Sequence, residues 1–275
     1  MYADDTLIYV CSKDVKEIEN NLNEDLNTLC KWFDNNLMKA NVKKTKVMIL
    51  GTPVKTSKID HVKVYMNNVE NVTCFKYLGV QIDVNLKWKE QINNICRKVC
   101  TSLAVMRRVK PFVPRSSLIT IYNTMVLPHF DYAITIWSSC SVINLNKLQK
   151  LQNTAMRIIL SVPYRTHIND MLRTLGFMNI RDRIIYLTGC MMYKVKNEIA
   201  PSYLNELFRP VSTIHSVNTR GSVNGDLYVP KCNTNYGKSS FQYKGSVLWN
   251  VISKDIRQVN SLMQFKNKLK EDLKL

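Results

Sequence analysis

The chain has 275 residues, 45% of them hydrophobic, and a formal net charge of +18 from 39 basic and 21 acidic side chains. This content supports a genuine core in one large domain or two smaller ones, which excludes a disordered tail. Residues 1–83 hold 11 basic and 11 acidic side chains, so residues 84–275 carry the whole net charge. Such a basic region predicts a polyanionic partner, with a solvated surface as the alternative.

The cysteines and the hydropathy pattern indicate an intracellular protein, in either the nucleus or the cytoplasm. The eight cysteines include no Cys-x-x-Cys pair. Cys96 and Cys100 are four apart on an expected helix, but no second pair follows at zinc spacing, so reduced thiols are the interpretation. No apolar run approaches the ~20 residues that span a bilayer, and we expect no membrane partner.

The first 83 residues are predicted to alternate strand and helix. Residues 6–10 suit a short strand. Ser12 can then cap an amphipathic helix whose apolar residues step by three or four as far as Phe33. β-branched and apolar residues predict further strands over 47–50, 62–66 and 80–82.

Helices are predicted to dominate from residue 84 onward. The apolar positions between Trp88 and Met106 predict a helix of about twenty residues that ends before Pro111. A second helix is expected to begin at Ser116 and to stop at Pro128. Further helices are predicted from about Ser141, over 166–176, 180–197 and 255–273, with a polar, glycine-bearing loop over about 209–245.

Two adjacent carboxylates, Asp4 and Asp5, follow an aromatic residue next to an expected strand. Carboxylate oxygens are the ligands that hard cations such as Mg²⁺ prefer. Alternation along a strand points the two side chains in different directions, so at most one is central. Two-metal phosphoryl transfer also needs an acid from another segment, and residues 1–83 offer no obvious candidate. On spacing alone, the pair is more typical of surface acids.

Several segments, in the right order along the chain, resemble the reverse transcriptases of jockey-like non-LTR retrotransposons. Tyr2-Ala3-Asp4-Asp5-Thr6 looks like the catalytic hairpin of that family. The segment 37–46 is similar to the following motif, Asn-x-x-Lys-Thr, and 75–80 is similar to the primer grip. The likeness continues through Pro128, Tyr132, Trp137, 165–167, 227–230, 240–241, 248–250 and 265–266, and so covers essentially the whole chain.

The resemblance implies roles for five residues near the catalytic hairpin. Asp4 would be the central metal ligand, with Asp5 beside it, in a two-metal Mg²⁺ site. Asn41 and Thr45 would lie near the incoming nucleotide. Lys44 would protonate the departing pyrophosphate as a general acid, although one solvated lysine in a cluster of four is the alternative.

The fold that the resemblance implies is α+β. It consists of the C-terminal half of a palm over 1–83, a helical thumb-like region over 84–165 and a helical C-terminal region over 166–275. The primer grip would be formed by Tyr77, Leu78 and Gly79. The first long helix would contact the phosphates of an RNA template and a DNA primer, or would simply be solvated on one side, through Lys89, Arg97, Lys98, Arg107 and Arg108.

The family also carries another catalytic aspartate and a nucleotide-selecting segment upstream of the hairpin. We therefore expect a fragment of an RNA-directed DNA polymerase that is inactive without its N-terminal palm and fingers segment. The alternatives are a polymerase component that uses Asp4, a non-catalytic nucleic-acid-binding remnant, and a relic that does not fold because half a palm sheet exposes an unpaired edge.

Overall fold

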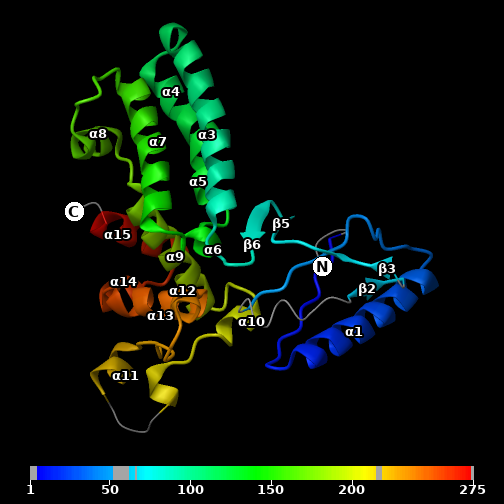
Figure 1. The fold of residues 1–275 in the computed structure, drawn as a ribbon. Coiled ribbons are helices and arrows are strands. Elements are labelled where there is room, and N and C mark those ends of the chain that lie inside the picture. Colours follow the sequence, from blue (N-terminus) through cyan, green and yellow to red (C-terminus); the bar gives the residue numbers. More distant parts are fainter. Residues whose placement is uncertain (1–4, 52–61, 66, 215–218, 274–275) are drawn as a thin grey trace. The chain divides into compact units, whose positions relative to one another are not determined.

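The structure is a computed structural model that describes residues 5–51, 62–65, 67–214 and 219–273 (Figure 1). The chain divides into two compact units, Met1–Leu86 and Lys87–Leu275. The first unit contains all the named strands of the described residues, and the second is helical. This combination agrees with the α+β class expected from the sequence.

One long amphipathic helix, α1 (Val15–Asn35), packs against strand β2 (Lys63–Val64) in the first unit. Its cap is Asp14, whose carboxylate accepts a hydrogen bond from the Lys16 backbone N–H at 2.9 Å. Ser12 instead accepts a hydrogen bond from the Asp14 backbone N–H, so the helix begins slightly later than expected. The strand expected over 6–10 was wrong, because these residues pair with no described neighbour and form no regular element.

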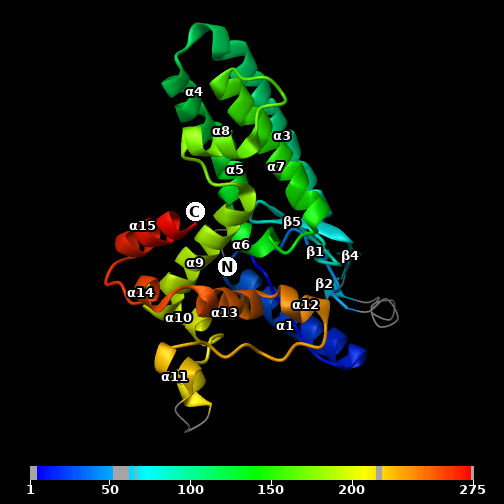
Figure 2. The ribbon, with the colours of Figure 1, turned by 90° about the vertical axis from the view of Figure 1, so that its left-hand side faces the viewer.

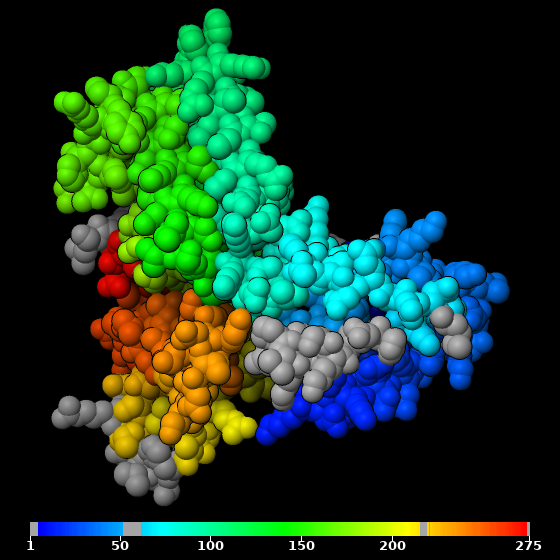
Figure 3. Space-filling model, viewed as in Figure 1, coloured from blue at the N-terminus to red at the C-terminus, as the bar shows by residue number. Residues whose placement is uncertain are grey.

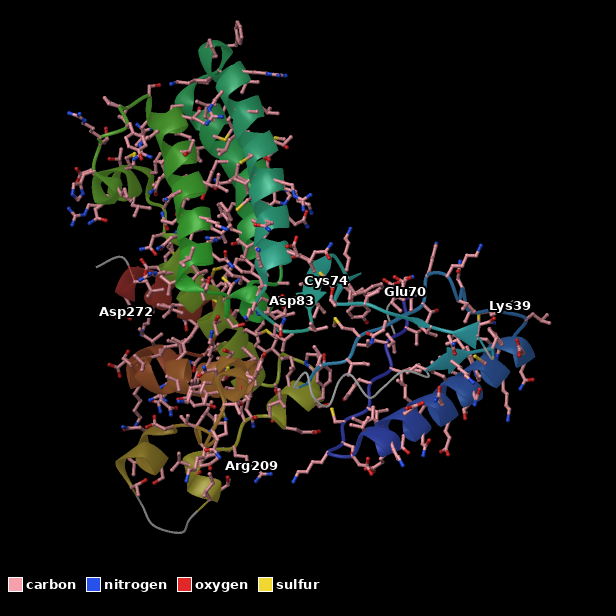
Figure 4. The ribbon with its side chains drawn as sticks, viewed as in Figure 1. Lys39, Glu70, Cys74, Asp83, Arg209 and Asp272 are labelled. Atoms are coloured by element: carbon pink, nitrogen blue, oxygen red, sulfur yellow. The ribbon has the colours of Figure 1, made fainter. Side chains whose placement is uncertain are left out.

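Six short strands form three two-stranded sheets among the described residues of the first unit. In the parallel pair β1–β4, Lys46 lies opposite Glu70 and their side chains form an ion pair. Glu70 is labelled in Figure 4. The strands are β1 (Lys46–Val47), β2 (Lys63–Val64), β3 (Asn67–Asn68), β4 (Glu70–Asn71), β5 (Cys74–Tyr77) and β6 (Val80–Asp83).

Two long helices, α3 (Lys89–Val109) and α7 (Val142–Leu160), lie side by side in the second unit (Figures 1 and 2). Both were predicted from their apolar periodicity, and the prediction is confirmed. Trp88 precedes α3 in the left-handed conformation with φ 61°, and its indole N–H donates to Ser139 Oγ at 2.7 Å. Helix α7 begins where the sequence predicted, and Ser141 is its N-terminal cap.

The segment between α3 and α7 turns back through short helices. A π-helical turn, Tyr122–Val126, joins α4 (Arg115–Ile121) to α5 (Leu127–Asp131). The expectation that Pro128 stops a helix was wrong, because Pro128 lies in the first turn of α5, where its missing N–H leaves no hydrogen bond unmade. The other two elements here are the 3₁₀ turn Lys110–Phe112 and α6 (Ile134–Trp137).

Polar contacts inside this helical core link α5 to α9 (Ile180–Lys196), and link α7 to the π-helical turn and to the segment that precedes α9. Asp131 pairs with Arg183 through two parallel hydrogen bonds. Burial alone would lower the pKa of Arg183, but the hydrogen bond and charge of Asp131 raise it. Gln152, 1% exposed, donates to the Tyr122 hydroxyl at 3.1 Å and to the Met178 carbonyl at 2.8 Å. These contacts fix three helices around one centre.

A second apolar cluster joins α9 to the C-terminal helices, around Tyr193, Trp249 and Phe265. The polar region over 209–245 is only partly a loop, because α11 and α12 form within it and α13 begins at Phe241. The single helix expected over 255–273 is divided into two. The elements are α8 (Ile168–Leu175), α10 (Ser202–Asn205), the 3₁₀ turn Val211–Thr213, α11 (Arg220–Asn224), α12 (Asn235–Ser239), α13 (Phe241–Val251), α14 (Lys254–Arg257) and α15 (Leu262–Asp272).

Candidate nucleic-acid interface

Helix α3 buries one face and exposes the other. Ile92, Val99 and Met106 are each 0% exposed, and the helix packs on α7 and on the π-helical turn. These apolar residues recur at the three- and four-residue spacing that places them on one side of a helix. Packing therefore fixes which face of α3 is left for solvent or a partner.

The exposed face of α3 is basic. Among its 21 residues, Glu90 is the one acid. All five side chains predicted to bind nucleic acid are exposed, and none forms an ion pair with a carboxylate in the described part of the chain. They are Lys89, Arg97, Lys98, Arg107 and Arg108. Their charges are thus available to an external anion.

The basic side chains are arranged along the helix as well as around it. At 3.6 residues per turn, four of them fall within an arc of about 100°, and Lys98 lies about 80° outside that arc. Lys89 and Arg108 are separated by about 28 Å along the axis at 1.5 Å per residue. This length corresponds to about eight nucleotide steps of one strand at about 3.4 Å each. Figure 3 shows the cyan-green side chains of α3 along the surface of the second unit.

His129 on α5 adds a titratable group beside this surface, which the sequence did not reveal. Burial lowers the pKa of His129 below its usual value, and the nearby Lys98 lowers it further. The two residues are 31 positions apart, and only the packing of α5 on α3 brings them together. The lowered pKa favours the neutral imidazole, so His129 adds little charge to the basic face.

Asn41, Lys44 and Thr45 come together in one tight turn ahead of β1. The Asn41 carbonyl accepts hydrogen bonds from the Lys44 and Thr45 backbone N–H groups at 3.0 and 2.9 Å and from the Thr45 hydroxyl at 2.9 Å. The Asn41 side chain accepts a further one from the Lys44 backbone. Asn41 and Thr45 thus build the turn, and the Lys44 side chain is exposed.

The turn is anchored nearby by Tyr65, whose hydroxyl donates to Asp34 at 3.1 Å and accepts from the Ala40 backbone N–H. Lys39 lies over the Tyr65 ring, 5.8 Å from its centre (Figure 4). These contacts connect the end of α1 to the segment that carries Lys44. Sequence reasoning did not identify Tyr65, because its partners are 25 and 31 residues away.

Tyr77, Leu78 and Gly79 form the end of the β5–β6 hairpin. Tyr77 pairs with Val80, so Leu78 and Gly79 are a two-residue turn, with φ angles of 44° and 81°. Positive φ at both positions is the geometry that matches the twist of the flanking strands, and glycine adopts it without steric cost. At the open end of the hairpin, Cys74 pairs with Asp83 (Figure 4).

Asp4 lies outside the described residues, and Asp5 is exposed. Among the residues that the structure describes, no group of three His, Cys, Asp or Glu side chains is close enough to hold a metal ion. Asp5 by itself does not fit a two-metal cage, which requires several converging carboxylates. The Mg²⁺ site at Asp4 and Asp5 stays a prediction.

Among the described residues, no helix is both long and apolar enough to cross a bilayer.

Comparison with known proteins supplies relatives for most of the chain. It is 25% identical over 231 residues to the RNA-directed DNA polymerase from mobile element jockey of Drosophila melanogaster. The matched stretch covers 82% of this chain and 24% of that protein. It is 29% identical over 193 residues to a probable RNA-directed DNA polymerase from transposon BS of the same species, covering 66% and 20%.

A third relative is the retrovirus-related Pol polyprotein from type-1 retrotransposable element R1 2 of Nasonia vitripennis, 25% identical over 143 residues, or 50% of this chain and 35% of that protein. The chain therefore spans about a third or less of each of these relatives. No protein-family model and no solved structure matches it. The resemblance seen in the motifs is confirmed: the chain is a homologue of the RNA-directed DNA polymerases of non-LTR retrotransposons.

Proposed function

We propose that this chain is the part of a retrotransposon RNA-directed DNA polymerase that holds an RNA template paired with a DNA primer. The observation that carries the proposal is the exposed basic face of α3, which lacks ion-pair partners among the described residues. Exposed Lys and Arg contacts to phosphates position a duplex without reading its sequence. The homology to RNA-directed DNA polymerases favours nucleic acid over other polyanions.

In this proposal the first unit is a partial palm and the second begins with a thumb. The Asn41–Thr45 turn holds Lys44 near the nucleotide, and the Tyr77–Gly79 turn contacts the primer. A two-residue hairpin turn and a hydrogen-bonded turn suit these roles, because strand pairing and backbone hydrogen bonds define the shape of each.

The binding experiment compares the intact chain with an Arg97→Ala/Arg108→Ala variant on an RNA–DNA duplex. Each substitution removes an exposed cation from the face opposite the buried one. We expect affinity at about 100 mM salt to fall by about tenfold or more, equally for duplexes of unrelated sequence. An Arg181→Ala/Lys254→Ala variant, which removes two exposed cations from α9 and α14, is the matched control. Equal affinity of both variants would sink the proposal.

We further propose that the chain does not polymerise alone, and that the complete polymerase uses two-metal phosphoryl transfer with Asp4 and Asp5 among its Mg²⁺ ligands. Such a site needs additional acids from another segment. Primer extension with the chain, Mg²⁺ and nucleotides should give no product. Extension that disappears in an Asp4→Ala variant would show instead that the chain is catalytically complete.

A second candidate function is a non-catalytic nucleic-acid-binding remnant of a mobile element. The observation in its favour is that Asp5 belongs to no cluster of potential metal ligands within the described residues. It predicts salt-sensitive duplex binding that an Asp4→Ala variant retains. It also predicts that adding the upstream segment of a related polymerase restores no extension, whereas the first proposal predicts restored extension.

A further inference from the structure

A small cavity of about 140 Å³ lies between α6, α9 and α13, away from the basic face of α3. Helix α6 contributes Thr135 and is followed by Ser138, α9 contributes Thr188, and α13 contributes Lys244. Its apolar walls are Ile184, Ile185, Phe241 and Leu248. Polar groups from three helices thus meet in a mostly apolar setting.

Lys244 is a half-buried cation without a counter-ion. Its side-chain ammonium forms no hydrogen bond or ion pair with any residue in the described ranges, and burial lowers the pKa of Lys244. Removing an ammonium from water is unfavourable unless an opposite charge or hydrogen-bond acceptors compensate. The position therefore favours an external anion.

The nearby thiol of Cys140 does not supply that negative charge. Burial raises the pKa of Cys140 to about 11, even though Lys244 acts to lower it. The thiol is consequently protonated and neutral at physiological pH. The charge of Lys244 stays uncompensated within the described structure.

Three hydroxyl groups complete the lining. The side chains of Thr135, Ser138 and Thr188 make no hydrogen bond to another described residue, although Thr188 is only 7% exposed. A hydroxyl is both a donor and an acceptor, so each of the three can bond to a ligand that enters the cavity. Three unpaired hydroxyls and one unpaired ammonium around one cavity form a set of donors.

We infer that this cavity binds a phosphate-sized oxyanion, with Lys244 supplying the charge and Thr135, Ser138 and Thr188 donating hydrogen bonds to its oxygens. A single water needs about 10–15 Å³ of such space, so the volume suffices for a tetrahedral anion. Lys244, Thr135 and Ser138 are partly exposed, which gives the anion a route in from solvent. The site is independent of α3 and of the proposed polymerase function.

The test is binding of inorganic phosphate to the full chain, measured by calorimetry against chloride at matched ionic strength. Lys244→Met keeps the side-chain length and removes the charge, and we expect it to weaken phosphate binding at least about tenfold, as loss of a charge-assisted hydrogen bond does. Thr188→Val removes one hydroxyl at constant shape and should weaken binding by a smaller factor. Lys254→Met, an exposed lysine of α14, should change it less than twofold.

A second comparison identifies the source of the anion. A short oligothymidylate with a 5′-phosphate is compared with the same strand ending in a 5′-hydroxyl. A phosphate-dependent gain that disappears in Lys244→Met assigns the site to a strand end, whereas Lys244-dependent binding of inorganic phosphate alone assigns it to the free anion. Binding of both probes that is unchanged in Lys244→Met, or absent from the unsubstituted chain, overturns the inference. Thermal unfolding of each variant shows whether the fold is retained.

Discussion

Replacing Gln152 by leucine should destabilise the helical core of the second unit. The Gln152 amide donates to the Tyr122 hydroxyl and the Met178 carbonyl and accepts from the Gln149 amide at 2.9 Å. Leucine has a similar volume, so the substitution removes hydrogen bonds with little change in packing. The Met178 carbonyl loses its partner, and an unsatisfied buried group costs about 1–3 kcal/mol.

Including the lost hydrogen bond to the Tyr122 hydroxyl, we expect a total loss of about 2–3 kcal/mol in unfolding free energy. For a unit of this size, 1 kcal/mol shifts Tm by about 2–4 °C, so Tm should fall by about 4–12 °C. Thermal unfolding followed by circular dichroism measures it, with Gln258→Leu on an exposed position as control. A change below about 2 °C would refute the view that Gln152 joins the helices energetically.

Three further changes probe packing, turn geometry and titration. Gly245→Ala would place a methyl group 2.6 Å from the Met192 sulfur. It should lower the free energy of unfolding, measured in urea, by about 1–3 kcal/mol, and unchanged stability would mean that the sulfur moves aside freely. Leu78→Asn, at φ 44°, should stabilise the hairpin by up to about 1 kcal/mol, seen as slower amide exchange, and faster exchange would contradict the turn assignment. The NMR-measured pKa of His129 should lie below 6.5 and rise in Lys98→Ala. The unfolded state then binds the proton more tightly than the folded state, so the contribution of the neutral His129 to folding stability is complete above about pH 6.5 and is lost on acidification. A measured His129 pKa above 6.5 would contradict this.

The sequence predicted the long helices because their apolar residues repeat at helical spacing over many turns. Helix α3, with its stripe from Ile92 to Met106, is the clearest case. The strand over 6–10 failed because a strand is defined by its partner, which a local pattern does not contain. Pro128 failed for a related reason: a proline is accommodated in the first turn of a new helix, and nothing in its neighbours predicts that a helix restarts there.

The candidate sites show the same division between local and distant information. The Asn41–Thr45 turn and the Leu78-Gly79 turn are local, and short motifs indicated both. The Gln152 contacts and the Lys244 cavity combine groups that lie 26 to 109 residues apart in the sequence, and no pattern along the chain joins them. The residue types at these positions give no local signal, because only the fold brings them together.

The salt dependence of duplex binding tests the account most directly. Affinity of the chain for an RNA–DNA duplex is measured between about 50 and 200 mM salt, and the slope of log affinity against log salt counts the phosphates that are contacted. The account predicts a steep negative slope that becomes shallower by about two units in Arg97→Ala/Arg108→Ala, about one for each lost contact. An identical slope in the variant and the unsubstituted chain would contradict it.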